Sequence, residues 1–235
     1  RMAVCLTIAG PGATNLSTGL YDAKEDRASV LSLNGQVRYQ YSGPGGTQEI
    51  DQDAFFRPVT VYNNTVYDKT MTLKLLTMAL KHAELRKGVA QLSVPNNVQK
   101  EPLEAKECIS ETCLTDLNIL PEEGRLEDAA KLIDRAERPV LVAGWGAYGH
   151  GDLVLRLSRR LKAPIVTTWR AKGILPEEGE NLAGIHGNVG PPFVKGLVKD
   201  SDLMIALGVG FSQQTDLPRG KSIVQVDIDP MRIGK

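Results

Sequence analysis

The sequence has few cysteines, few aromatic residues and no excess of charge of either sign. It contains 3 cysteines, 5% aromatic residues, and 28 basic against 28 acidic side chains in 235 residues. A small, odd number of thiols suits a reducing compartment better than a disulfide framework, so we expect a cytoplasmic protein. A formal net charge of zero gives no reason to expect binding to nucleic acid or to an anionic membrane surface.

Long hydrophobic runs are also missing. No stretch approaches the ~18 apolar residues of a transmembrane helix, and no charged segment followed by an apolar one resembles a secretory signal. Cys108 and Cys113 lack the close spacing and the neighbouring histidine of a metal site, so we predict no metal ligands in this chain. The remaining composition, with 42% hydrophobic and 24% charged residues, is that of a globular protein with a core.

Continuous apolar runs alternate with stretches of helical periodicity. The predicted strands are 3–9, 29–33, 89–94, 139–143, 164–168, 202–207 and 222–227, and the predicted helices are 70–86, 126–136 and 152–161. Continuous apolar runs are typical of strands that are buried on both faces, as in parallel sheets. The alternation of strands and helices predicts an α/β fold with parallel sheets.

One segment interrupts this alternation. Residues 96–121 are polar and charged, without a clear period. We place a linker at 99–118, between a first domain at 1–98 and a second at 119–235. The chain enters a predicted strand at once and stops at the predicted start of a helix, so we expect both ends to be cut from a longer protein.

The second half contains a possible nucleotide-binding turn. Residues 144–149, GWGAYG, match the pattern G-x-G-x-x-G between a predicted strand and a predicted helix. Glycines let backbone N–H groups approach a phosphate, although a tight turn without a ligand explains the motif equally well. An NAD site needs a carboxylate at the end of the next strand, where the sequence has Thr167-Thr168-Trp169-Arg170. An NAD-dependent dehydrogenase is therefore disfavoured.

Three further segments follow predicted strands or form turns near them: 184–188, 208–211 and 227–229. In open parallel sheets ligands bind outside the carboxyl ends of strands, so these segments together favour an extended nucleotide ligand. Asp227 or Asp229 would accept hydrogen bonds from its ribose or adenine; the alternative for each is a helix N-cap. His186 by itself is more often structural than catalytic.

Several stretches resemble a known family. GPGATNLSTGLYDAKEDRASVLSLNGQ, TQEIDQDAFFRPVTVYN and GVAQLSVPNNV resemble thiamine-diphosphate enzymes of the pyruvate oxidase and acetolactate synthase group. RPVLVAGWGAYGHG, KAPIVTTWRAKG, AGIHGNVG, SDLMIALGVGF and IVQVDIDPMRIGK are similar to their central domain. The resemblance implies that 1–98 is the later part of a pyrimidine-binding domain and 119–235 most of a Rossmann-like central domain. The diphosphate-binding domain, with its magnesium site, would lie outside the chain.

The resemblance also implies site residues. It places Pro11, Gly12 and Asn15 against the aminopyrimidine of thiamine diphosphate across a dimer interface, and Gln48 beside the reaction centre as the one catalytic residue. The alternative for Gln48 is a loop amide that makes only local hydrogen bonds. Thr47 stands where the family usually has Phe, which implies an altered substrate pocket. The implied FAD-site residues are Gly144, Trp145, Gly146, Thr167, His186, Gly187, Asn188, Gly208, Asp227 and Asp229.

The implied activity is thiamine-diphosphate-dependent, flavin-containing decarboxylation of pyruvate with oxidation of the acyl intermediate. It would require thiamine diphosphate, Mg²⁺ and FAD in a homodimer or homotetramer. The stretches GLYDAKED and VTVYN lean toward pyruvate oxidase. One alternative is acetolactate synthase-like carboligation of 2-keto acids. The other is a non-catalytic flavin- or nucleotide-binding fragment, because the chain alone lacks complete thiamine half-sites and is expected to be inactive by itself.

Overall fold

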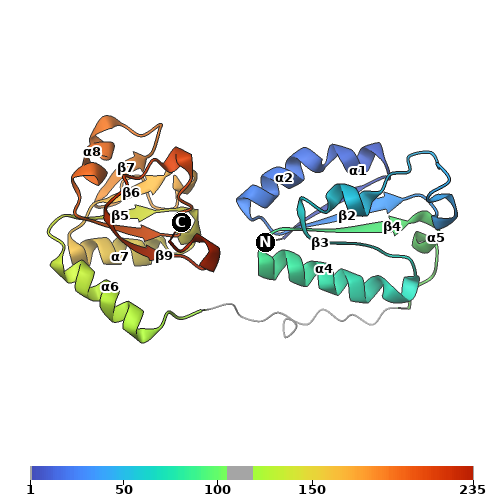
Figure 1. The fold of residues 1–235 in the computed structure, drawn as a ribbon, viewed down its shortest axis with the longest axis horizontal. Helices are drawn as coiled ribbons and strands as arrows, with labels where there is room; N and C mark the ends of the chain where they lie inside the picture. The colour runs from blue at the N-terminus through green and yellow to red at the C-terminus, as the bar shows by residue number, and fades with distance from the viewer. Residues whose placement is uncertain (1, 105–118, 235) are drawn as a thin grey trace. The chain divides into compact units, whose positions relative to one another are not determined.

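In the computed structural model the described residues are 2–104 and 119–234. They belong to two compact units, Arg1–Asn118 and Ile119–Lys235 (Figure 1). Each unit holds one parallel sheet with helices on both faces, so the predicted α/β class with two parallel sheets is confirmed. Most of the predicted linker, residues 105–118, lies outside the described residues, and the linker stays a prediction.

The first unit is built on a four-stranded sheet with the order β1-β2-β4-β3. Its parallel strands are β1 (Ala3–Thr7), β2 (Val30–Gln36), β3 (Thr60–Thr65) and β4 (Val89–Pro95). The register pairs Thr7 with Asn34, and Asn34 with Ser93. Polar residues of three neighbouring strands therefore lie side by side near the carboxyl edge of this sheet.

Helices cover both faces of the first sheet (Figure 1). These helices are α1 (Pro11–Asn15), α2 (Ser17–Asp26), α3 (Gln52–Phe56), α4 (Thr72–Arg86) and the short α5 (Asn96–Gln99). On one face Leu31 and Leu92 pack in a cluster with Leu75 of α4. Burial of such alternating apolar side chains on both faces stabilises the sheet by removing apolar surface from water.

The second unit is built on a five-stranded sheet with the order β7-β6-β5-β8-β9. Its parallel strands are β5 (Pro139–Ala143), β6 (Ile165–Thr168), β7 (Leu182–His186), β8 (Leu203–Leu207) and β9 (Ser222–Val226). Its longer helices are α6 (Glu123–Arg135), α7 (Gly151–Leu161) and α8 (Pro192–Asp200). Strand order reverses between β5 and β8, which makes the carboxyl end of this pair a topological switch point.

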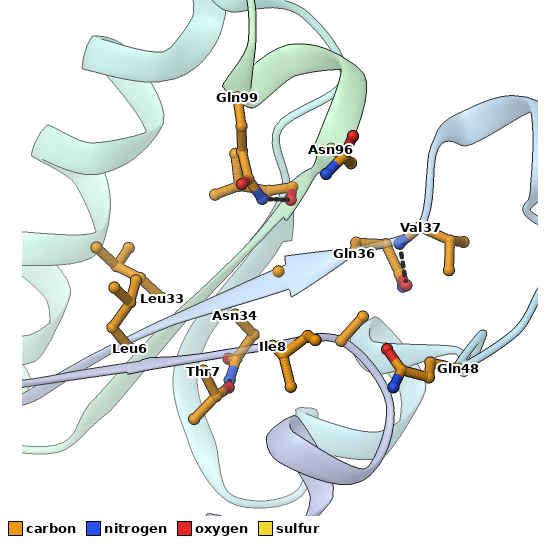
Figure 2. A pocket seen from close by; sticks show the side chains of 13 residues that line it. Leu6, Thr7, Ile8, Leu33, Asn34, Gln36, Val37, Gln48, Asn96 and Gln99 are labelled. Atoms are coloured by element: carbon orange, nitrogen blue, oxygen red, sulfur yellow. Dashed lines mark hydrogen bonds between the residues drawn. The ribbon is translucent and has the colours of Figure 1, made fainter.

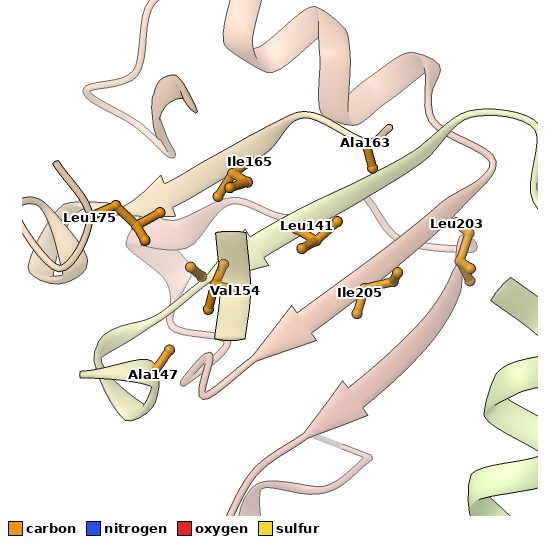
Figure 3. Packing of buried hydrophobic residues seen from close by; sticks show 9 residues of the cluster. Leu141, Ala147, Val154, Ala163, Ile165, Leu175, Leu203 and Ile205 are labelled. Atoms are coloured by element: carbon orange, nitrogen blue, oxygen red, sulfur yellow. The ribbon is translucent and has the colours of Figure 1, made fainter. Parts of the chain in front are cut away.

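The core of the second unit lies on both faces of its sheet. Figure 3 shows Leu141, Ile165 and Ile205 of three strands packed with Val154 of α7. Val142 lies on the opposite face of the sheet, in a cluster with α8. The continuous apolar runs from which these strands were predicted are thus explained by burial on both faces.

The seven predicted strands are all present, but β3 and β7 were not predicted. The predicted turn over 184–188 is wrong for residues 184–186, which belong to β7. Gly184 has a φ of 125°. The register shifts at this point, between the pairs Ile165↔Leu182 and Val166↔Gly184. A glycine bulge therefore interrupts an edge strand and gives it the sequence pattern of a turn.

Candidate functional site

A cleft of about 680 Å³ lies in the first unit at the carboxyl ends of β1, β2 and β4 (Figure 2). Its apolar walls are formed by Leu6, Ile8, Leu33, Val37 and Val94. Its amide side chains belong to Asn34, Gln36, Gln48, Asn96 and Gln99. Apolar walls with a few amide groups suit a small planar ligand with polar substituents.

The GPGATN corner follows β1 directly at the edge of this cleft. Gly10 has φ 60° and ψ −116°, a conformation that favours glycine, and Pro11 occupies the first helical position of α1. A β-carbon on Gly10 would lie 2.7 Å from the carbonyl oxygen of Gln48. The corner therefore requires glycine at position 10, and this glycine brings the backbone of Gln48 against the start of α1.

The predicted residues of the first domain lie in and beside the cleft. Gln48 and Ile8 line it (Figure 2). Ala9 lines it as well. Pro11, Gly12 and Asn15 follow this wall in α1. The structure thus brings the corner and the TQEID loop together, while contact of α1 with a cofactor stays a prediction.

A buried hydrogen-bond network supports the floor of the cleft. Asn34, which is only 1% exposed, donates through Nδ2 to Oγ1 of Thr7 at 2.6 Å. Its Oδ1 accepts from Oγ of Ser32 at 2.9 Å and from Nε2 of Gln91 at 3.2 Å. Because buried polar groups are costly when unpaired, this network fixes the orientation of Thr7 and Asn34 where they face the cleft.

In the second unit, the predicted glycines lie at the switch point. A β-carbon on Gly144 would lie 2.2 Å from the carbonyl oxygen of Gly208, and one on Gly146 would lie 2.7 Å from Cα of Gly208. The N–H of Gly146 donates to this carbonyl at 3.1 Å. The structure therefore brings these three residues together, and close packing of two backbone turns explains why each is glycine.

Exposed aromatic rings flank these turns. Trp145 and Tyr148 stack with ring centroids 4.9 Å apart, and they are 46% and 65% exposed. Trp145 begins the short 3₁₀ helix η4 (Trp145–Ala147). Thr167, in contrast, is buried within β6. Of the predicted site residues, Trp145 is therefore accessible to a ligand, whereas Thr167 lies in the core.

His186, Gly187 and Asn188 are tied to the loop at 212–216. Nε2 of His186 lies 3.3 Å from the carbonyl oxygen of Asp216, and the N–H of Asn188 donates to the carbonyl of Gln214 at 3.0 Å. The ring of His186 is buried, and Nδ1 has no hydrogen-bond partner in the structure. Burial lowers the pKa of His186 below its ordinary value, because the charged form of the ring loses its hydration.

Asp227 and Asp229 shape the turn that follows β9. Oδ1 of Asp227 accepts from the N–H of Asp229 at 2.9 Å. Oδ1 of Asp229 accepts from the N–H of Met231 at 3.0 Å and caps the 3₁₀ helix η7 (Pro230–Arg232). Asp229 is therefore an N-cap, which was the alternative expected for it from the sequence.

Two findings concern metals and membranes. Among residues 2–104 and 119–234, no group of three or more His, Cys, Asp or Glu side chains is placed to hold a metal ion. Across the same residues, no helix combines the length and the apolar character needed to cross a membrane. Cys108 and Cys113 lie outside the described residues.

Two family models match the chain. The N-terminal TPP binding domain of thiamine pyrophosphate enzymes matches residues 1–55, and their central domain matches residues 126–235. The chain belongs to the thiamine pyrophosphate enzyme family. The first match contains both the GPGATN corner and Gln48, and the second contains the glycine turns at the switch point. The family predicted from the sequence is thus confirmed.

Relatives within this family carry different activities in their names. The chain is 35% identical over 235 residues to the Bacillus subtilis protein YdaP, whose name describes it as thiamine pyrophosphate-containing. It is 27% identical over 240 residues to pyruvate oxidase of Lactiplantibacillus plantarum, and 30% identical over 244 residues to the acetolactate synthase isozyme 1 large subunit of Escherichia coli. Each alignment covers 100% of this chain but only 41%, 40% and 43% of the respective relative. The chain thus spans about two fifths of their length.

Sequence reasoning missed three residues around the cleft of the first unit. Gln36 donates through Nε2 to the carbonyl of Ile50 at 2.9 Å, and Asn34 anchors the network below it. Glu49 accepts from the N–H groups of Gly45 and Gly46 at 2.9 and 3.0 Å. The sequence contains a pattern that could have indicated Glu49. This acidic residue comes shortly after the glycine-rich stretch SGPGG, with only Thr47 and Gln48 between them.

Proposed function

We propose that the whole protein is a thiamine-diphosphate-dependent, flavin-containing enzyme that decarboxylates pyruvate. The two-carbon intermediate left after loss of CO₂ would pass two electrons to an acceptor and so be oxidised to the acyl level. The observation that carries this proposal is the contact between Gly10 and Gln48 at the cleft, within the matched TPP binding domain. It joins the GPGATN corner and the TQEID loop, which the resemblance assigns to the aminopyrimidine and to the reaction centre. In this proposal, residues 1–98 bind the pyrimidine half of the cofactor and residues 119–235 bind the flavin nucleotide.

The cleft fits the aminopyrimidine of thiamine diphosphate in chemical character. Leu6, Ile8 and Val37 offer apolar contacts to a flat ring. The amide of Gln48 can donate to an oxygen of a bound 2-keto acid and orient it. When bound, thiamine diphosphate supplies the electron sink for decarboxylation. The role of this chain is to bind and orient the reactants and to exclude water from them.

The second unit fits a flavin nucleotide at the switch point of its sheet. Nucleotides in open parallel sheets bind outside the carboxyl ends of strands at this place. The exposed rings of Trp145 and Tyr148 offer an aromatic surface for a flat ring system. When bound, FAD accepts the two electrons of the oxidation. Asp227 is our candidate for hydrogen bonds with the ribose or adenine.

The proposal also includes an oligomeric state and a metal ion. We infer a homodimer or homotetramer, in which α1 of one subunit faces the cofactor held by the partner's diphosphate-binding domain. Mg²⁺ would be bound by that domain, outside this chain. A reaction centre between subunits predicts that a dissociated subunit has no activity, even with thiamine diphosphate and Mg²⁺ added.

The second candidate function is acetolactate synthase-like carboligation of two 2-keto acids. It is supported by relatives that bear this name at 30% identity over the whole chain, as similar as the named pyruvate oxidase. A third, a flavin- or nucleotide-binding fragment without catalysis, applies to the isolated chain. The two enzymatic candidates share the first half of the reaction and differ in what accepts the acyl unit.

The test uses the full-length protein with pyruvate, thiamine diphosphate and Mg²⁺. Release of CO₂ with reduction of a dye, or with formation of peroxide, supports the oxidase proposal. Acetolactate without net oxidation would overturn it in favour of the synthase. If the full-length protein binds FAD but releases no CO₂, the binding-only alternative replaces both. Omission of thiamine diphosphate is the control, and it should abolish every activity.

A further inference from the structure

A carboxylate organises the loop that carries Gln48. Oε2 of Glu49 accepts from the N–H groups of Gly45 and Gly46 at 2.9 and 3.0 Å, and Oε1 accepts from the N–H of Gly43. The N–H of Glu49 itself donates to the carbonyl of Gly46 at 2.9 Å. N–H groups that converge in a glycine-rich turn form a nest that binds an anion, and here the anion is a side chain of the same loop.

The nest depends on glycine conformations and on both carboxylate oxygens. Gly43 and Gly45 have φ of 100° and 92°, in a region that favours glycine. Hydrogen bonds from backbone N–H groups, with Gly43 the strongest contributor, lower the pKa of Glu49. A neutral glutamine would offer one oxygen in place of two, and its NH₂ group would face an N–H donor. The charge and the forked shape of Glu49 are therefore matched to the nest.

The residue next to Glu49 has a constrained backbone. Gln48 has a φ of 65°, which is rare for a residue with a β-carbon. On one side its carbonyl and Cα lie against Gly10. On the other side, the carbonyl of Ile50 accepts from Nε2 of Gln36 at 2.9 Å. The nest holds Glu49, so the backbone is fixed at Gln48 and at both residues that follow it. The side chain of Gln48 lines the cleft (Figure 2).

We propose that Glu49 is a positioning residue, whose carboxylate folds the glycine-rich loop so that the amide of Gln48 is presented to the reactants in the cleft. This inference rests on the proposed function, because it takes Gln48 to be the group that touches substrate. Glu49 does not line the cleft and acts through its neighbour. A strained backbone conformation at a functional residue persists only when its surroundings hold it, and Glu49 with Gly10 and Gln36 provides that support.

The first experiment measures the loop directly in the full-length protein without cofactor. Amide hydrogen exchange of residues 42–50 is compared in wild type, Glu49→Gln and Glu101→Gln. Glu101 lies in the same unit, and its carboxylate is 3.8 Å from Nζ of Lys69 in an exposed pair. We expect exchange in the loop to become at least about tenfold faster in Glu49→Gln, because charge-assisted hydrogen bonds are lost, and to be unchanged in Glu101→Gln. Unchanged exchange in Glu49→Gln overturns the inference.

The second experiment separates positioning from a general effect on stability. For pyruvate turnover, we expect Glu49→Gln to lower kcat about tenfold or more with little change in melting temperature. In the background of Gln48→Ala, the same substitution should cost no further activity, because its effect passes through Gln48. Additive losses overturn the inference. A wild-type protein without thiamine-dependent turnover overturns the proposed function instead, and the exchange experiment still decides whether Glu49 holds the loop.

Discussion

The backbone of Gln48 lies directly against Cα of Gly10, so that a β-carbon at position 10 would meet the carbonyl oxygen of Gln48 at 2.7 Å. Gly10 belongs to the turn after β1, whereas Gln48 belongs to the loop between β2 and α3. A single contact therefore couples the two segments that we connect with the cofactor and the substrate. Any side chain at position 10 would separate them.

The first prediction is that Gly10→Ala destabilises the first unit and impairs turnover. Both the positive φ and the overlap with Gln48 disfavour alanine, and conformational strain of this kind costs about 1–3 kcal/mol. Amide hydrogen exchange of β2 and β4 reports the stability of this unit. The matched control is Gly19→Ala in α2, where a β-carbon meets no atom within 4 Å and helix propensity favours alanine by up to about 1 kcal/mol. Equal effects of the two substitutions would contradict the prediction.

The second prediction concerns the network beneath the cleft. Asn34→Ala removes the acceptor for Ser32 and Gln91 and the donor to Thr7, all in a buried region. Polar groups left unpaired there should cost about 1–3 kcal/mol of unfolding free energy, measured by urea unfolding. Asn97→Ala, which removes one acceptor for the N–H of Tyr39 at 3.3 Å, serves as the control and should cost much less.

Several elements could be predicted from the sequence because burial determines their pattern. β5 and β8 are central strands in contact with helices on both faces, and their continuous apolar runs were identified. β3 and β7 are edge strands and were missed. The residues of β3, TVYNNT, are polar and mostly half-buried, while a glycine bulge interrupts β7. The edge strands β1 and β9 carry mostly apolar runs and were identified, whereas β3 and β7 lack such runs. A single neighbouring strand and partial burial leave the side chains of an edge strand less constrained, so an apolar pattern is not guaranteed there.

The candidate site was predictable only in part. The resemblance singled out Pro11, Gly12 and Asn15 in the GPGATN corner and Gln48 in another motif, but nothing local says that Gly10 of this corner touches Gln48. Contacts between segments that are distant in the sequence are determined by the topology of the fold. Here the start of α1 and the TQEID loop meet beside the end of β2. Glu49 was overlooked because a carboxylate in a loop usually means only exposure to solvent. Its role becomes visible once its hydrogen bonds with Gly45 and Gly46 are seen.

The third prediction is that Gly146, in the glycine motif of the second unit, is needed for the packing of this unit and not only for binding a nucleotide. Gly146→Val should destabilise this unit even without a nucleotide, because its β-carbon would lie 2.7 Å from Cα of Gly208. Overpacking of this kind costs about 1–3 kcal/mol or more. Hydrogen exchange of β5 and β8 in the flavin-free protein measures the effect. Gly196→Ala in α8, where a β-carbon has open space, is the control. Unchanged exchange in Gly146→Val would show that the turns can move apart.

The fourth prediction is that His186 contributes to a loss of stability at mildly acidic pH, in addition to His82, whose pKa burial also lowers. His186 is 4% exposed, and this burial lowers the pKa of its ring. The charge of Lys195 lowers the pKa further, and Asp216 opposes the shift only in part. The unfolded chain takes up a proton as the pH falls through about 6.5, the ordinary histidine value, whereas the folded protein takes it up only at lower pH. Between these two pKa values the unfolded state binds more protons, so the unfolding free energy falls as the pH falls.

For one histidine this slope is at most about 1.4 kcal/mol per pH unit. We therefore expect His186→Gln to retain more of its stability than wild type does when urea unfolding is compared at pH 7.5 and pH 5.5. This window lies above the range in which Asp202 and other carboxylates with lowered pKa lose their contribution. His150, an exposed histidine at the start of α7, provides the control variant His150→Gln. If His186→Gln and wild type lose equal stability across the window, the buried ring does not contribute to the acid sensitivity.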